Sequence, residues 1–478
     1  MSNTAQSLAS KRINSLLDAN SFVEIGGYVT ARSTDFNMQQ NETPSDGVIT
    51  GFGIIDGNLV YVYSQDASVL GGTIGEMHAK KIVGLYDLAM KMGAPVIGLI
   101  DCAGLRLQEA TDALNAFGEI YMKQALASGV IPQITAIFGN CGGGLALVPG
   151  LTDFTFMEDK KAKLFVNSPN ALDGNNVSKC DTASAKFQSK ETGLVDASGS
   201  EEEVLNQIRE LVCMIPANNE DDMSYDECDD DLNRVCKDLE NAAGDTSILL
   251  SSISDNHVFF ETKKEYAKEM VTGFIRLNGM TVGAVANRTE VCDEEGNTAE
   301  KYDAVLTTKG AKKAAKFVKF CDAFNIPVLS VTNVTGFKAD MHSERNIAKA
   351  VAELTYAFAD ATVPKVNLIT GAAFGSAYVA MNSKAIGADL TFAWSDAQIG
   401  MMDAKLAAKI MYADADVSVI NEKAAEYAAL QSSVAAAAKR GYVDTIIEAE
   451  DTRKYVIGAF EMLFTKREDR PNKKHGTV

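Results

Sequence analysis

Residues 131–144 read IPQITAIFGNCGGG, and residues 363–376 read VPKVNLITGAAFGS. In both stretches a proline precedes a short apolar run that ends in a small-residue turn, and Gly143 has its counterpart 232 positions later at Gly375. A continuous apolar run of this length, bounded by turn residues, is typical of a strand buried on both faces of a parallel sheet. The repeated strand and turn therefore predict two copies of one α/β unit.

The same spacing of 232 residues holds upstream of these strands. In each copy an amphipathic helix is followed by an apolar strand and a glycine. The matched positions are Ala79 and Ala311, Pro95 and Pro327, and Gly104 and Gly336. Downstream, TDFTF at 152–156 resembles ADLTF at 388–392 with an offset of 236, as expected if a surface loop gained four residues. A duplication with a constant offset predicts two domains of the same architecture.

Bulk composition limits the classes of protein to which the chain can belong. Its 478 residues are 46% apolar and 23% charged, which suits two globular domains. A formal charge of −19 argues against nucleic acid as a partner, because nucleic-acid binding uses basic surfaces. The N-terminus lacks the apolar core of a signal peptide, and the cysteines form no C-x-x-C pair. We expect a cytoplasmic protein with reduced thiols and no zinc site.

An acidic segment separates the two copies. Residues 220–231 contain eight carboxylates and few apolar side chains, which indicates a solvated linker. A cation site is the alternative, although the spacing is not that of a calcium loop. We place the domains at residues 1–235 and 236–478.

The two glycine turns are the candidate functional sites. Gly142, Gly143 and Gly144 allow close approach to a ligand, and the N–H groups at the start of the next helix favour an anion. Neither turn has the pattern of a P-loop or of a dinucleotide site, so a carbonyl oxygen that becomes an enolate is the other candidate ligand. Close helix–strand packing explains one such turn equally well, whereas two matched turns favour a shared function.

Longer stretches resemble the carboxyltransferase subunits of biotin-dependent acyl-CoA carboxylases and decarboxylases. The resemblance spans nearly the whole chain. The stretches that carry it are GGTIGEMHAKK at 71–81, DCAGLRLQE at 101–109, SGVIPQI at 128–134, the triple-glycine turn, KFCDAFNIP at 319–327, ATVPK at 361–365 and GADLTFAW at 387–394.

This resemblance implies two tandem crotonase-like domains of the ClpP/crotonase spiral type, with acyl-CoA on the N-terminal side and biotin on the C-terminal side. Gly143 and Gly144 would hold the thioester oxygen. Gly375, Ser376 and Ala377 would hold the ureido oxygen of biotin. The residues expected to line these two sites are Gly104, Arg106, Gly142, Phe374 and Tyr378. Active sites would form between the N-half of one subunit and the C-half of another, in a dimer or hexamer.

Two side chains near these motifs have open alternatives. Arg106 follows a strand end, where it would either contact CoA or fix the loop through an ion pair with Glu109. His78 would either contact substrate or pack in the core. Because no acidic pair follows either turn, we expect main-chain amides, rather than a side-chain acid or base, to carry the chemistry.

The second half departs from the family pattern at three places. Residues 334–340 read VTGFKAD where relatives have Val-Pro-Gly-Phe and Leu-Pro-Gly, and Gly371 with Ala372 replaces an Arg-Lys pair. Ser376 replaces a glycine, which preserves the backbone donors only if its φ is negative. The geometry on the biotin side is therefore the most open part of the prediction.

The sequence AMKM at residues 89–92 matches the tetrapeptide around a biotinylated lysine, but the apolar spacing around it is helical, whereas a carrier lysine projects from a hairpin. Biotin is therefore expected on a separate carrier protein. We predict a carboxyltransferase that moves a carboxyl group between biotin and an acyl-CoA of the methylmalonyl- and propionyl-CoA class. It would be one subunit of a decarboxylase that also contains a membrane sodium pump. The alternatives are a β subunit of an acetyl- or propionyl-CoA carboxylase beside a biotin carboxylase, a non-catalytic scaffold, and a crotonase-type hydratase or isomerase.

Overall fold

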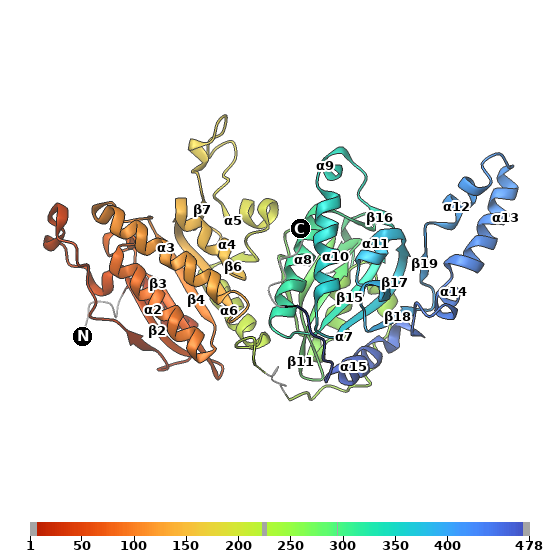
Figure 1. The fold of residues 1–478 in the computed structure, drawn as a ribbon, viewed down its shortest axis with the longest axis horizontal. Helices are drawn as coiled ribbons and strands as arrows, with labels where there is room; N and C mark the ends of the chain where they lie inside the picture. Colours follow the sequence, from red (N-terminus) through yellow and green to blue (C-terminus); the bar gives the residue numbers. More distant parts are fainter. Residues whose placement is uncertain (1–6, 222–226, 294, 472–478) are drawn as a thin grey trace. The chain divides into compact units, whose positions relative to one another are not determined.

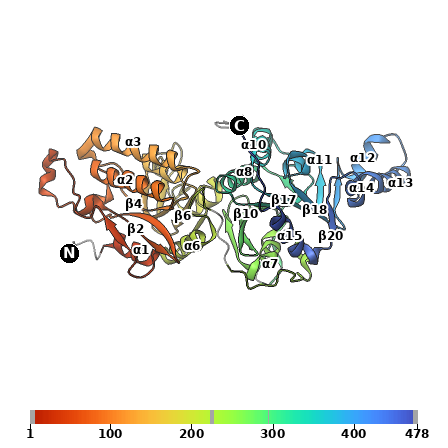
Figure 2. The same cartoon turned by 60° about the horizontal axis from the view of Figure 1, so that its bottom comes forward.

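The computed structural model describes residues 7–221, 227–293 and 295–471. The chain divides into two compact units, residues 1–222 and 223–478, and each unit contains an eight-stranded sheet with helices on both faces (Figures 1 and 2). The α/β class and the duplication predicted from the sequence are confirmed.

The first unit has the strand order β1-β2-β3-β4-β5-β6-β8, with β7 paired to β5. Strands β1 to β3 are antiparallel, and the pairs from β3 onward are parallel. The strands are β1 (Val23–Ile25), β2 (Val48–Ile55), β3 (Asn58–Gln65), β4 (Val96–Cys102), β5 (Gln133–Gly142), β6 (Phe154–Glu158), β7 (Lys163–Phe165) and β8 (Ala197–Gly199). Figure 2 shows α2 (Glu76–Met92) and α3 (Ala110–Ala127) on one face, and α1 (Leu8–Leu16) and α6 (Glu201–Met214) on the other.

The second unit repeats this plan with the order β20-β18-β17-β15-β11-β10-β9 and β19 paired to β17. Its strands are β9 (Phe259–Thr262), β10 (Met270–Leu277), β11 (Met280–Asn287), β15 (Val328–Val334), β17 (Lys365–Phe374), β18 (Leu390–Trp394), β19 (Gln398–Gly400) and β20 (Thr445–Ile447). Helices α8 (Thr308–Ala323) and α10 (Ile347–Asp360) cover one face, and α7 (Thr246–Ile253) and α15 (Thr452–Leu463) cover the other (Figure 2). Helices α12 (Ala404–Met411) and α13 (Val417–Tyr427) extend away from this sheet (Figure 1).

The predicted offset is confirmed in the elements themselves. Helices α2 and α8 begin at residues 76 and 308, and strands β5 and β17 begin at 133 and 365, so both pairs differ by 232 positions. The hairpins that precede them also match, because each has a two-residue turn with positive φ at both positions: Asp56 and Gly57 in one, Asn278 and Gly279 in the other. Such turns suit the right-handed twist of the flanking strands.

Helix α2 ends where its sequence predicts. Gly93 has φ 61° and ψ 51°, the left-handed conformation that commonly terminates helices, and Ala94 and Pro95 follow it. The AMKM tetrapeptide lies inside this helix, which confirms the predicted helical conformation. No helix in the described ranges is long and apolar enough to span a bilayer.

Part of the acidic segment packs in the second unit. Asp230 pairs with Arg234 at 3.0 Å, and both interact with groups of that unit. The buried guanidinium of Arg453 in α15 donates to the Ile253 carbonyl at 2.7 Å and to the Asp231 carbonyl at 3.2 Å. These residues therefore belong with the second unit, upstream of the boundary expected at 235/236, while Asp222 and Asp226 lie outside the described residues.

We predict that Arg453→Leu destabilises the second unit by about 3–5 kcal/mol, because it leaves the buried Asp255 carboxylate, 2.7 Å from the guanidinium, without its cationic partner. Urea unfolding followed by tryptophan fluorescence measures this loss, since the chain's one tryptophan, Trp394, is buried in that unit. Lys454→Leu is the matched control, because Lys454 is 40% exposed and its loss should cost less than about 1 kcal/mol. Equal losses in the two variants would contradict the prediction.

Candidate active site

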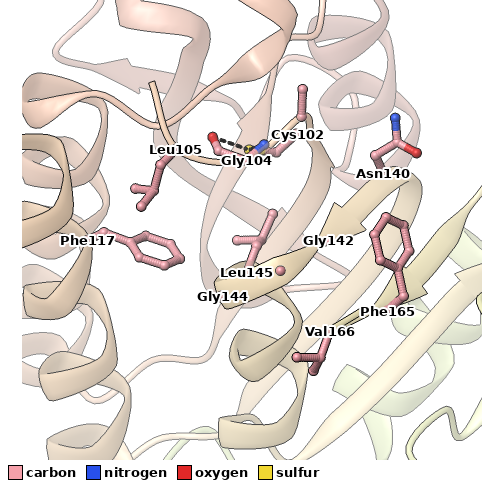
Figure 3. Close-up of a pocket in the computed structure, with 12 residues that line it drawn as sticks. Cys102, Gly104, Leu105, Phe117, Asn140, Gly142, Gly144, Leu145, Phe165 and Val166 are labelled. Atoms are coloured by element: carbon pink, nitrogen blue, oxygen red, sulfur yellow. Dashed lines mark hydrogen bonds between the residues drawn. The ribbon is translucent and has the colours of Figure 1, made fainter. Parts of the chain in front are cut away.

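A cavity of about 490 Å³ lies beside the ends of β4 and β5 in the first unit (Figure 3). Four of the residues predicted for the acyl-CoA side, namely Gly104, Gly142, Gly143 and Gly144, line it. The other lining residues are Cys102, Ala103, Leu105, Phe117, Asn140, Leu145, Phe165 and Val166. Main-chain atoms and apolar side chains therefore dominate its wall.

The first glycine turn has a conformation that explains its composition. Gly142 is extended and pairs with Phe165 of β7, and a Cβ atom at position 142 would lie 2.7 Å from the Phe165 ring. Gly143 has φ +63°, where side chains are disfavoured, and it begins a 3₁₀ turn at Gly143–Leu147. The N–H groups at the start of such a turn have no acceptor within it, so they are available to a ligand.

The second turn has the same backbone course. Phe374 is extended, Gly375 has φ +61°, and α11 (Gly375–Ala380) begins there. Ser376 is exposed and lies in this helix outside the left-handed region, so its φ meets the condition stated for a serine at this position. Exposure also matches between the copies, because Gly144 and Ser376 are exposed while Leu145 and Ala377 are buried.

The side chains predicted beside the second turn are mostly inside the protein. Phe374 is 5% exposed and Ala377 is fully buried, so their side chains are not available to a ligand. Tyr378 packs on the core residues of the second unit, and burial raises the pKa of its hydroxyl to about 12. The assignment of Phe374 and Tyr378 to biotin binding stays a prediction.

A polar side chain from the preceding strand lies against each turn. A Cβ atom at Gly139 would lie 1.9 Å from the Asp101 carboxylate, which pairs with Arg12 at 3.0 Å. At the equivalent place in the second unit, a Cβ atom at Gly371 would lie 2.7 Å from Asn333, whose amide oxygen accepts from Ala372 N–H. Asn333 leaves no room for a side chain at position 371. This contact explains why a glycine stands there in place of the arginine of the family pattern, and the sequence alone did not reveal it.

The ends of β4 and β15 are held by equivalent side chains. The Asp101 N–H donates to the Gln65 amide oxygen at 3.3 Å, and the Asn333 N–H donates to the Asn287 amide oxygen at 3.1 Å. Gln65 and Asn287 both end the second strand of a hairpin. Sequence reasoning missed this pair, because glutamine and asparagine at a strand end carry no distinctive pattern.

Arg106 supports the wall of the cavity without lining it. Its side chain is 1% exposed, and one guanidinium nitrogen contacts Asp46 at 2.6 Å and Glu109 at 2.8 Å. The other terminal nitrogen donates to the Thr73 carbonyl at 2.8 Å. The ion pair with Glu109 considered from the sequence is present, and these contacts favour the loop-fixing alternative over a contact with CoA.

His78 is fully buried behind this network. Its Nδ1 lies 2.9 Å from the Asp46 carbonyl oxygen, and its Nε2 lies 3.2 Å from the Gln65 amide nitrogen. Burial, and then the nearby positive charge of Arg106, lower its pKa to about 3. His78 therefore packs in the core as a neutral imidazole, which favours the packing alternative.

None of the twelve described residues that line the cavity carries a carboxyl or imidazole group. Cys102 is the one thiol among them, and burial raises its pKa to about 12. The wall thus lacks a group suited to proton transfer near neutral pH, whereas its glycine turn supplies main-chain donors of the kind that stabilise oxyanions. The aromatic wall from Phe117 and Phe165 was not predicted, because Phe117 reads as an ordinary core position of a helix.

Comparisons with known proteins give one consistent group of relatives. The carboxyl transferase domain family matches residues 3–478. The chain is 38% identical to the methylmalonyl-CoA decarboxylase subunit alpha of Propionigenium modestum, over 98% of this chain and 92% of that protein. It is 39% identical to the propionyl-CoA carboxylase beta chain of Roseobacter denitrificans, over 98% and 93%. A structure of transcarboxylase 12S, described as a hexamer with hydrolysed methylmalonyl-coenzyme A bound, gives a TM-score of 0.91 at 35% identity, over 99% of this chain and 92% of that chain.

We predict that His78 makes the first unit sensitive to acid. Between pH 6.5 and about 3 the unfolded chain binds a proton at His78 that the folded chain excludes, so stability falls as pH falls, by up to about 1.4 kcal/mol per pH unit. His78→Gln should flatten the stability–pH slope between pH 6.5 and 5, measured by hydrogen-exchange protection of α2. The exposed His342 offers the control His342→Gln, which should keep the wild-type slope. An unchanged slope in His78→Gln would show that the imidazole is not excluded from protonation.

Proposed function

The chain belongs to the carboxyl transferase family, and from this premise we propose that it moves a carboxyl group between an acyl-CoA of the methylmalonyl- and propionyl-CoA class and biotin on a separate carrier protein. The family and the named relatives make it an acyl-CoA carboxyltransferase. The observation that carries the finer proposal is the pair of matched turns, with φ +63° at Gly143 and +61° at Gly375.

The first turn would stabilise the acyl-CoA side of the reaction. When the carbon–carbon bond to the carboxylate breaks, its electron pair moves toward the thioester carbonyl and places negative charge on that oxygen. The N–H groups of Gly143 and Gly144 at the cavity wall are suited to hold this oxygen. Because a main-chain amide does not titrate, the charge is stabilised without a proton transfer, and the lining without carboxylates fits this role.

The second turn fits the polar oxygen of a urea group by the same geometry. Biotin, when bound, would supply a ureido nitrogen that takes up the carboxyl group and gives its proton to the α-carbon of the acyl-CoA. The ureido oxygen would need hydrogen-bond donors while that nitrogen is deprotonated. Gly375, Ser376 and Ala377 begin α11, so their N–H groups are available for this purpose. A Cβ atom at Gly375 would lie 3.2 Å from the Met401 carbonyl, so a small residue keeps this space open.

The proposal includes assembly and partners. Transcarboxylase 12S is described as a hexamer in a multienzyme core, and we propose a homo-oligomer of that kind for this chain. Besides the biotin carrier, the complex would contain one further partner. This partner is a membrane sodium pump in a decarboxylase, or a biotin carboxylase in a carboxylase. Sequence alone does not separate these two settings, because both use the same half-reaction in opposite directions.

The direct test is release of CO2 by the purified protein from malonyl-, methylmalonyl- and glutaconyl-CoA, with and without free biotin. We expect biotin-dependent release from methylmalonyl-CoA. If no CO2 is released, calorimetry should be used to measure the binding of each acyl-CoA. Binding without turnover would indicate that the true carrier protein is needed, whereas no binding would indicate that the site is absent. Neither turnover nor acyl-CoA binding would favour the scaffold alternative, whereas hydration or isomerisation of an enoyl-CoA would favour the hydratase alternative.

We predict that Gly143→Ala and Gly375→Ala each lower kcat about 10- to 100-fold, because alanine disfavours their left-handed φ and turns the adjacent N–H groups away. Gly375→Ala should also raise the KM for free biotin, and Gly143→Ala should leave it unchanged.

The matched controls are Gly57→Ala and Gly441→Ala, one in each unit. Both positions have positive φ and open space around the added methyl group. These controls should lose comparable stability, about 1 kcal/mol, and keep kcat. If the turn variants behave like the controls in the transfer assay, the glycine turns are structural only.

A further inference from the structure

The three glycines of the first turn contribute no side chains to its support, although the buried Cys141 thiol donates to the Leu145 carbonyl across it at 3.5 Å. Gly142, Gly143 and Gly144 lack side chains, and glycine has the greatest backbone freedom of any residue. The second turn differs at its entry, where the buried side chain of Phe374 stands in place of Gly142, whereas Ala377 and its counterpart Leu145 are buried in both copies. Donors that stabilise charge must be fixed before the reaction begins, so the first turn requires a support from outside itself.

One side of this turn is held by strand pairing. Gly142 is the last residue of β5 and pairs with Phe165 of β7. Its extended φ and ψ, −118° and 158°, are those of a strand, so the segment enters the turn in a fixed direction. The free segment therefore begins at Gly143.

The other side is held by a tyrosine of helix α3. The Tyr121 hydroxyl donates a hydrogen bond to the Gly144 carbonyl oxygen. A Cβ atom at Gly144 would lie 3.1 Å from that hydroxyl and 3.2 Å from the Phe117 ring, so both α3 side chains lie directly against the glycine. Phe117 and Tyr121 also pack on each other, with ring centroids 5.0 Å apart.

Since the entry at Gly142 and the exit at Gly144 are both fixed, the orientation of the intervening peptide is determined. We infer that Tyr121 is a positioning residue for carboxyl transfer, which holds the Gly143 and Gly144 N–H groups toward the acyl-CoA oxygen through its bond to the Gly144 carbonyl. This inference rests on the proposed function. Burial raises the pKa of the Tyr121 hydroxyl, so it remains a donor at neutral pH.

The repeat itself indicates that the bond serves this turn specifically. The position 232 residues after Tyr121 is Glu353, which cannot donate from an ionised carboxylate to a carbonyl oxygen. The helix of the second unit thus has no tyrosine at the repeat position. The tyrosine is present beside the turn with three consecutive glycines, and a glutamate occupies its position in the other copy.

The test is Tyr121→Phe, which removes the hydroxyl and keeps the ring on Phe117. We expect kcat for biotin-dependent CO2 release to fall about ten-fold, while the KM for methylmalonyl-CoA changes less than about two-fold. Affinity for S-propyl-CoA, a thioether without the carbonyl oxygen, should be unchanged, because the CoA contacts remain. Affinity for propionyl-CoA should also change less than about two-fold, because its carbonyl oxygen carries no developing charge in the ground state.

Tyr86→Phe is the matched control, since the Tyr86 hydroxyl links α2 to α3 through Gln124 at 3.5 Å and does not touch the turn. It should lose similar thermal stability and keep kcat. Equal kcat in wild type and Tyr121→Phe, equal kcat losses in the two variants, or a rise in KM in place of the loss of kcat would each overturn the inference. Failure of the proposed function is distinguishable, because wild type itself would then show no biotin-dependent release.

Discussion

The constraint on which the rest depends is a left-handed glycine at the end of a buried parallel strand. At Gly143 and Gly375 the chain leaves its strand, turns with φ near +60°, and begins a helical turn. No other residue type adopts this φ as readily, and without it the first N–H groups of the next segment would point elsewhere. The donor geometry is therefore a property of the backbone, and any substrate oxygen held there is held by the fold itself.

A backbone site of this kind needs rigid surroundings, and buried polar contacts supply them. Arg106, Asp46 and Glu109 form a buried cluster in which one guanidinium contacts both carboxylates, and Asp46 also accepts the His78 N–H at 2.8 Å. Glu109 also accepts the Glu76 N–H at 2.6 Å, so the loop at the cavity wall is tied to the start of α2. Because these charges are nearly inaccessible to solvent, their removal should affect the shape of the cavity more than its chemistry.

Much of the architecture could be predicted from one sequence, because a duplication gives two independent views of each element. The strands before Gly143 and Gly375, the helices before them and the offset of 232 all follow from apolar periodicity and from proline and glycine positions. What the sequence did not predict were the long-range contacts of particular residues. Gln65 and Asp101 are 36 positions apart, and Tyr121 and Gly144 are 23 apart, so no local pattern connects them. His78 and Arg106 lie in motif-like stretches, but whether a motif residue faces a cavity or the core depends on packing that periodicity does not specify.

The two copies also show how one scaffold can fix the same turn in two ways. In the second unit, apolar burial of Phe374 and Ala377 fixes the turn, and that anchoring is non-directional and insensitive to a single hydrogen bond. In the first unit Leu145 is buried like Ala377, but Gly142 stands in place of Phe374, and a directional bond from Tyr121 to the Gly144 carbonyl supports the turn. The two copies thus support the turn differently, with the buried Phe374 side chain in one and a hydrogen bond from a neighbouring helix in the other, while the backbone conformation at the glycine is the same in both.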